Sequence, residues 1–306
     1  MLLKKILRSF KPKPQRLLGI DLNSHAIRLV ELSFSQGNYQ VETWANITLP
    51  LIEMNGTKLS TIIQQSKTTT KIAAIALSHS EIIFKEIKVI SGLSPKKLNT
   101  FLQFNMEKYI GTTADSVSFD YHLVQQVTTK EKHILLQLAA ARRERIVQYL
   151  QLLQAANLSP KIIDVNSCAL ERIVRHQLKN IIGLVAIINI EIDSILIVVI
   201  NHEKTIYTHE DCITATMQTT AQITEQLILK LQLVFAAVTQ PLNEIILAGA
   251  KATAAGLDIT VSEQLKIPTT VLNPYLNMRW STNITKTSDA AMTISCGLAL
   301  RVTDAI

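Results

Sequence analysis

Two stretches of the chain, far apart in the sequence, show the same order of hydrophobic and polar segments. Residues 17–47 contain an apolar run that ends at Asp21, a polar turn, a second apolar run, a turn around Gly37 and a third run. Residues 184–209 repeat this order. Short runs rich in Val, Ile and Leu between polar turns predict β-strands. A repeat at this long spacing predicts two similar lobes, with the first turn of each facing the other across a ligand cleft.

Strands and helices alternate in the rest of the chain, as expected for an α/β protein. Between the repeats we predict strands within 71–90, 117–126, 132–141 and 158–164. We predict helices over 94–110, 142–157 and 165–176, the first of them with Ser94 as N-cap and Pro95 at its first position. After the second repeat we predict a long helical region over 212–239, a strand over 243–249, a helix that ends at Lys266, a strand near Val271 and a final helix from Ser288 to Thr303.

The apolar stretch 181–200 is long enough to be mistaken for a membrane span. Its centre carries Asn189, Glu191 and Asp193. Polar and charged groups are costly at the centre of a bilayer. Its two β-branched halves on either side of this polar turn instead predict a buried β-hairpin.

Most of the positive charge belongs to the first residues of the chain. The formal net charge is +7, and residues 1–16 hold +6 of it because they contain six basic side chains and no acid. Residues 1–10 place apolar side chains at helical spacing between these bases, which predicts a basic amphipathic helix that contacts an anionic membrane surface. A terminus that packs on the core is the alternative. The remaining 290 residues carry only +1, so nothing indicates a nucleic-acid partner.

Three cysteines lie far apart, at positions 168, 212 and 296, and the seven histidines are scattered. This spacing matches no metal-ligand motif, and it fits a reducing compartment.

Four sequence stretches resemble one known family. They are GIDLNSHAIRLVEL at 19–32, FNMEKYIGTTADSVSFDYHLV at 104–124, the segment 138–174, and ISCGLALR at 294–301. Together they resemble the PilM family of type IV pilus assembly proteins and, more distantly, the cell-division protein FtsA. The first stretch alone indicates only the wider actin-like superfamily, whereas the central and C-terminal stretches are specific to PilM.

The resemblance implies an α/β, actin-like (RNase H-like) fold of two lobes, with an α+β subdomain inserted in lobe one and a reduced subdomain in lobe two. The implied division is 1–16 as basic tail and linker, 17–67 and 158–180 as lobe one core, 68–157 as the insert, and 181–306 as lobe two with a shortened insertion around 212–240.

The resemblance also implies a role. Members of the family are cytoplasmic scaffolds, peripheral to the bacterial inner membrane, in the platform that assembles type IV pili. They bind the short cytoplasmic N-terminal tail of PilN, an inner-membrane protein, and work with other pilus platform and motor proteins. We therefore expect a PilN-like partner and a peptide groove at the inserted subdomain.

Family members also place a nucleotide between the lobes, and this chain departs from that pattern. Phosphate loops need glycine so that backbone N–H groups can approach the anion. The expected site residues are Asp21, which would hold magnesium if Mg-ATP binds, and Asn23, Ser24, His25, Asn189, Glu191, Gly249 and Ala250. Asn23 and Glu191 replace glycines, Asn189 replaces an acid, and Ala250 replaces the second glycine of a pair. We expect a degenerate site, no required cofactor and little or no catalysis.

Two alternatives remain open on the sequence alone. In the first, ATP and magnesium bind between the lobes and switch the affinity for a partner, with weak ATPase activity. In the second, the chain is the cytoplasmic part of a type II secretion platform protein of the GspL kind.

Overall fold

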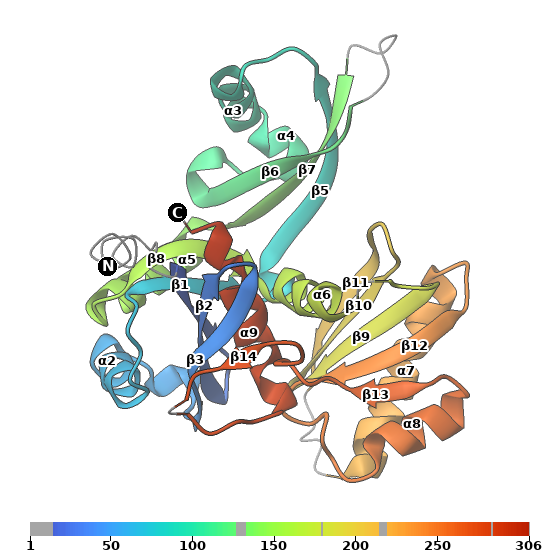
Figure 1. Ribbon diagram of the computed structural model, residues 1–306. Coiled ribbons are helices and arrows are strands. Elements are labelled where there is room, and N and C mark those ends of the chain that lie inside the picture. The colour runs from blue at the N-terminus through green and yellow to red at the C-terminus, as the bar shows by residue number, and fades with distance from the viewer. Residues whose placement is uncertain (1–14, 127–132, 179, 214–218, 283, 306) are drawn as a thin grey trace, which may run out of the picture.

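Each lobe is built around one β-sheet, and the two sheets share a strand order. The computed structural model describes residues 15–305 apart from 127–132, 179, 214–218 and 283, so the predicted tail helix over 1–10 lies outside the described residues. The two lobes lie side by side, and a smaller sheet projects from the first (Figure 1).

The sheet of lobe one has the order β14-β3-β2-β1-β4-β8, and that of lobe two has the order β11-β10-β9-β12-β13. The strands of lobe one are β1 (Gln15–Leu22), β2 (Ala26–Ser35), β3 (Asn38–Thr48), β4 (Ile72–Leu77), β8 (Ser159–Val165) and β14 (Arg279–Trp280). Those of lobe two are β9 (Leu184–Ile190), β10 (Ser194–Ile200), β11 (Thr205–Cys212), β12 (Leu242–Ala248) and β13 (Thr269–Val271). In both lobes the first three strands are antiparallel and the fourth pairs in parallel with the first. The predicted repeat is confirmed.

The apolar stretch 181–200 forms the antiparallel pair β9 and β10 at the centre of lobe two. Every residue of β9 is buried, which explains why both halves of this stretch read as continuous apolar runs. The predicted hairpin is confirmed. Among the described residues, no helix is both long and apolar enough to cross a membrane.

The two lobes share part of one hydrophobic core. Its buried residues come from the lobe-one sheet, such as Leu17, and from the lobe-two sheet, such as Val185, and Ile294 of α9 (Thr293–Ala299) joins them. Helices α6 (Asn166–Gln177) and α9 lie between the sheets (Figure 1). The other helical elements are η2 (Leu51–Glu53), α2 (Gly56–Gln65), η3 (His79–Glu81), α5 (Arg143–Ala155), α7 (Thr220–Ala237), α8 (Leu257–Leu265), η5 (Ala290–Met292) and η6 (Leu300–Thr303).

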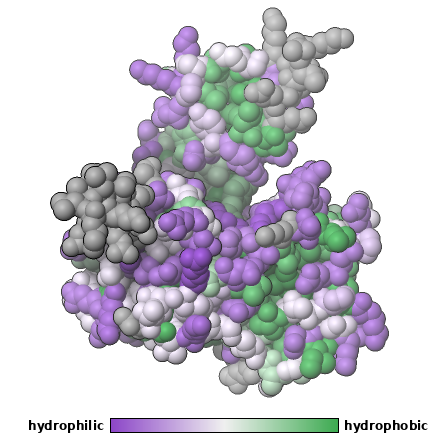
Figure 2. All heavy atoms as spheres, in the orientation of Figure 1, coloured by the Kyte–Doolittle hydropathy of each residue, from purple (hydrophilic) through white to green (hydrophobic). Residues whose placement is uncertain are grey.

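The inserted subdomain is a three-stranded antiparallel sheet with helices on one face. Its sheet has the order β5-β7-β6, and it comprises β5 (Ile82–Ile90), α3 (Pro95–Phe104), α4 (Met106–Ile110), η4 (Ala114–Ser116), β6 (Val117–Gln126) and β7 (His133–Arg142). A separate core of apolar side chains, Leu102 and Leu138 among them, holds it together. Figure 2 shows it standing above the two lobes, with hydrophobic side chains gathered over its sheet.

This insert is narrower than the expected 68–157. Strand β4 pairs with β1 and β8 in the sheet of lobe one. Helix α5 packs against α2 and β8, and its Leu153 belongs to the core of lobe one. Both elements therefore belong to lobe one, and the insert proper spans 82–142.

Three predicted helices differ from the structure. The final helix, predicted from Ser288 to Thr303, is α-helical only over Thr293–Ala299, with the short 3-10 turns η5 before it and η6 after it. The long helical region over 212–239 is wrong at its start, because β11 continues to Cys212 and α7 begins at Thr220. Thr219 caps α7: its side chain accepts from the backbone of Gln222, whose side chain accepts in return from the backbone of Thr219. The helix predicted over 94–110 is interrupted at Asn105, which ends α3 and begins α4.

Candidate site between the lobes

The two polar turns of the repeat meet at the junction of the lobes. Asn23 shapes the first turn, because its side-chain oxygen accepts from the backbone N–H groups of His25 (3.0 Å) and Ala26 (2.8 Å). Its side-chain nitrogen lies 3.5 Å from a carboxylate oxygen of Glu191 in the second turn. The hydroxyl of Ser24 donates to Asp193, also in the second turn, at 2.6 Å. The expected facing of the two turns is confirmed.

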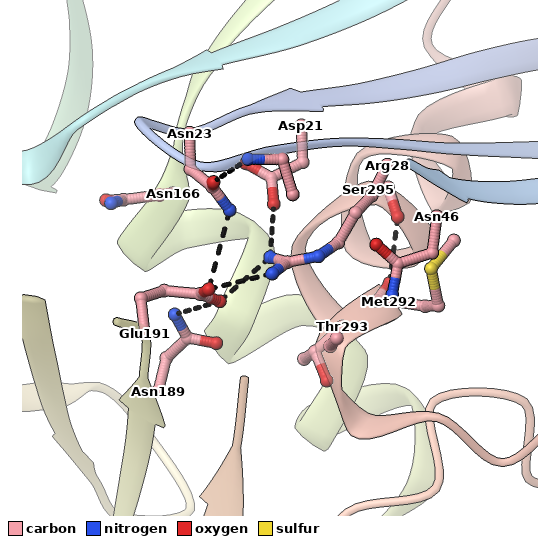
Figure 3. Close-up of polar contacts among 12 residues, drawn as sticks. Asp21, Asn23, Arg28, Asn46, Asn166, Asn189, Glu191, Met292, Thr293 and Ser295 are labelled. Carbon is pink, nitrogen blue, oxygen red and sulfur yellow. Dashed lines mark hydrogen bonds and ion pairs between the residues drawn. The ribbon is translucent and has the colours of Figure 1, made fainter. Parts of the chain in front are cut away.

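A buried arginine fills the space between the turns. The guanidinium group of Arg28 donates to both carboxylate oxygens of Glu191 at 2.8 Å, and to Asp21 at 3.2 Å (Figure 3). Arg28 is only 2 % exposed, and Asp21 and Glu191 are buried as well. The two carboxylates, which would otherwise repel each other, are therefore bridged by one cation.

Strand register explains this arrangement. Arg28 in β2 lies directly opposite Asp21 in β1, so both side chains point to the same face of the sheet. Glu191 directly follows β9, and its N–H donates to the carbonyl of Ser194 at 2.9 Å, which closes a tight turn. The carboxylate of Glu191 is thereby presented to the other lobe.

Burial shifts the pKa values of the acid and the base in this cluster in opposite directions, because it disfavours the charged form of each. It raises the pKa of Asp21 to about 6; Arg28 opposes this shift, and Glu191 adds to it. Burial alone lowers the pKa of Arg28, but Glu191 and Asp21 together raise it above its ordinary value. Arg28 is therefore a permanent cation between the lobes.

A cleft of about 340 Å³ adjoins this cluster, and it contains five of the eight expected site residues. They are Asp21, Asn23, Ser24, Asn189 and Glu191. His25 lies outside the cleft lining and contacts Asp193, with 3.6 Å between its Nδ1 and the carboxylate. Gly249 and Ala250 are not part of the lining either. Gly249 has a φ of +90° and packs on the backbone of Ile190, where a Cβ would lie 2.5 Å from the carbonyl oxygen. Backbone conformation and packing therefore explain why this position is a glycine.

This arrangement does not fit a magnesium–triphosphate group. The oxygen of Asp21 that would hold a cation faces the guanidinium of Arg28, and a second cation there would be repelled. The carboxylate of Glu191 occupies the second turn, where phosphate oxygens would meet a negative charge. Binding of such a group requires the side chains of Arg28 and Glu191 to leave their present positions.

The far side of the cleft holds a second contact between the lobes. Glu210 of β11 accepts hydrogen bonds from the hydroxyl of Ser78 (2.5 Å) and the N–H of Ser80 (2.9 Å). Its other oxygen accepts from the side chain of Asn166 at 2.7 Å. Lobe two thus holds the short turn that contains η3 in lobe one.

A larger groove, of about 860 Å³, lies where the insert joins lobe one. Apolar side chains from the insert line it, including Ile83, Ile110 and Val117. Arg142 and Arg145 line it together with Glu81 and Glu144, so charges of both signs are present in the lining. The groove is the largest of the described cavities, and its mixed lining suits a peptide.

Sequence reasoning missed Arg28 and Glu210 as site residues. The signal for Arg28 is visible in retrospect: it is a charged residue inside AIRLVEL, a buried run whose other charged residue is Glu31. Glu210 lies in the polar run THEDC, which gives no such contrast.

Comparison with known proteins decides the family. The sequence profile described as "Type IV pilus assembly protein PilM" matches residues 19–230 and 218–303, which is most of the chain. The chain belongs to the PilM family. The expected resemblance is confirmed.

Solved structures agree with this assignment at the level of the fold. A chain of a PilM-PilN type IV pilus biogenesis complex is 18% identical, with a TM-score of 0.76, and the match covers 95% of this chain and 99% of that one. The cytoplasmic domain of EpsL, an inner membrane component of the type II secretion system of Vibrio cholerae, is 14% identical with a TM-score of 0.52 and covers 93% and 94%. The ethanolamine utilization protein EutJ from Carboxydothermus hydrogenoformans is 12% identical with a TM-score of 0.52 and covers 95% and 90%.

The α/β, actin-like two-lobed fold with an insert in lobe one is therefore confirmed for this PilM-family chain. Membership also gives it a place in type IV pilus assembly.

Proposed function

We propose that the protein is a cytoplasmic scaffold of the inner-membrane platform for pilus assembly, and that it binds the cytoplasmic tail of a PilN-like membrane protein. The groove between the insert and lobe one carries this proposal. Family membership and the fold shared with a chain of a PilM-PilN complex support it. Other pilus platform and motor proteins are further partners under this proposal.

The lining of the groove indicates which kind of peptide it accepts. Ile83 is 45% exposed at its edge, and an apolar side chain of a bound peptide would cover it. Arg143 is not free to bind a peptide carboxylate, because it donates to the carbonyls of Ala114, Asp115 and Val117. A short extended peptide with apolar side chains fits this lining.

We further propose that this scaffold works without a nucleotide. The ion pair between Arg28 and Glu191 supports this, because it already joins the lobes at the place where a nucleotide would have to bind. Under this proposal, ATP hydrolysis is not part of the function.

Calorimetric titration with a synthetic PilN-like tail peptide tests the scaffold role. We expect binding by the wild-type chain and a loss of at least about tenfold in affinity for Ile83→Asp, because a buried charge is costly. Ile90→Asp is a matched control: Ile90 is on the same strand, is 53% exposed and does not line the groove. Absence of binding by the wild-type chain, or equal losses in both variants, contradicts the proposal.

Thermal unfolding with and without millimolar Mg-ATP tests the nucleotide-free role. A ligand that binds only the folded state raises the melting temperature. We expect no shift. A rise of several degrees would instead support a nucleotide-switched protein.

A further inference from the structure

One short turn, Ser78–Glu81, contributes to the walls of both the cleft between the lobes and the groove at the insert. Ser80, Glu81 and Arg145 line the cleft between the lobes and also line the groove at the insert. The turn contains η3, which buries none of its residues. Apart from the His79 ring, which stacks on Phe84 with 5.2 Å between the ring centroids, the turn is held mainly by polar contacts.

Lobe two supplies central contacts to this turn. The carboxylate of Glu210 accepts from the Ser78 hydroxyl at 2.5 Å and from the Ser80 N–H at 2.9 Å. Its other oxygen accepts from Asn166, which in turn accepts from the N–H of His79 at 2.9 Å. Hydrogen bonds to a carboxylate are stronger than those between neutral groups. Glu210 thus fixes the turn directly and also through Asn166.

The turn then positions an arginine in the groove. Glu81 accepts from the N–H of Ser78 at 3.1 Å, and its other oxygen accepts from Nε of Arg145 at 2.6 Å. Arg145 also donates to the hydroxyl of Tyr149 at 2.9 Å, and its guanidinium lies over the Tyr149 ring, 4.6 Å from the centroid. A displacement of the turn would move Glu81 and release Arg145 from this position.

We propose that Glu210 is a positioning residue for peptide binding, although it belongs to lobe two and does not line the groove. It holds Ser78–Glu81, and through Glu81 it sets the place of Arg145 in the groove wall. This inference rests on the proposed function, because it concerns the same groove. It makes the peptide affinity depend on the contact between the lobes.

Peptide titration of Glu210 variants tests the inference. We expect Glu210→Ala to bind the PilN-like peptide at least about fivefold more weakly, because the turn loses its acceptors. Glu210→Gln retains one oxygen that accepts from Ser78 and Ser80, but its NH2 group faces the donating amide of Asn166, so we expect an intermediate loss of about twofold to threefold. Thr205→Val is the matched control: Thr205 is also in β11, and its hydroxyl donates to Glu171 of α6 at 2.6 Å, away from the groove. We expect no change in its affinity.

A double-mutant cycle with Arg145→Ala separates positioning from general destabilisation. If Glu210 acts through Arg145, the double variant binds no more weakly than Arg145→Ala alone. Additive losses, or a Glu210→Ala affinity equal to that of the wild type, overturn the positioning role and leave the proposed function standing. Failure of the wild-type chain to bind the peptide overturns both.

Discussion

Arg28 of lobe one and Glu191 of lobe two form a two-armed ion pair, with both N–O distances at 2.8 Å. The residues are 163 positions apart in the sequence, and both are buried. Two parallel charge-assisted hydrogen bonds fix the orientation as well as the distance. The pair therefore sets how the two lobes meet.

Arg28→Met leaves two buried carboxylates without their cation. We expect this variant to lower the free energy of unfolding by about 3–5 kcal/mol, because an uncompensated buried charge is costly. The triple variant Arg28→Met, Asp21→Asn, Glu191→Gln removes the charges together and should recover most of that loss. Urea denaturation measures both. If the triple variant is as unstable as Arg28→Met, the loss comes from packing and not from charge.

The pKa of Asp21 makes stability depend on pH. Its value of about 6 in the folded protein lies above 3.8, the ordinary value that it takes in the unfolded chain. The folded state binds this proton more tightly, so its contribution to stability is full below about pH 4 and is lost as pH rises through about 6. Asp21→Asn cannot ionise. We expect its stability relative to the wild type to rise by about 1–3 kcal/mol between about pH 4 and about pH 7. Denaturation across this range checks the prediction, and a difference that does not change with pH contradicts it.

The fold was predictable from the sequence to the extent that it depends on local pattern. The order of apolar runs and polar turns gave the strands of both lobes, because a buried strand needs a continuous apolar run between turns. The start of α7 was not predictable from the same pattern, because β11 is only half-buried and polar and so resembles the segment that follows it.

The candidate site was predictable only in its turns. Asp21, Asn23 and Glu191 were expected together, since they follow the first strands of the two repeats. Arg28 was missed because its closer partner, Glu191, is in the other lobe, and pairing across lobes leaves no periodic signal. The groove at the insert was expected from the family resemblance, but the role of Glu210 in its wall was not, because Glu210 reaches Arg145 only through the η3 turn.

Gly19 should tolerate no side chain. Strand β1 runs against α9 so closely that a Cβ at Gly19 would lie 2.0 Å from the carbonyl oxygen of Ser295 and 2.7 Å from the nitrogen of Ala299. Backbone atoms cannot move aside as a flexible side chain can. We expect Gly19→Ala to cost about 3 kcal/mol or more. Gly37→Ala is the control: its φ is +76°, but no atom lies within 4 Å of the added methyl group. It should cost about 1–2 kcal/mol, from backbone strain alone. Equal losses in urea denaturation would contradict the close contact.

The last prediction concerns an anion in place of the internal carboxylates. In the variant Asp21→Asn, Glu191→Gly, Arg28 keeps its charge, loses both acidic partners and faces the cleft that Glu191 lined. A small anion such as phosphate can then pair with the guanidinium. We expect the variant to be less stable than the wild type in plain buffer and to be stabilised by phosphate, by about 1.4 kcal/mol when phosphate is at ten times its dissociation constant.

The control is the same variant with Arg28→Met added, which lacks the cation. Phosphate should stabilise this control no more than it stabilises the wild type. The wild type measures the general effect of phosphate on folded proteins. Thermal unfolding over a phosphate series makes the comparison. If phosphate stabilises the two variants equally, Arg28 is not accessible from the cleft, and Glu191 is then not the group that keeps anions out.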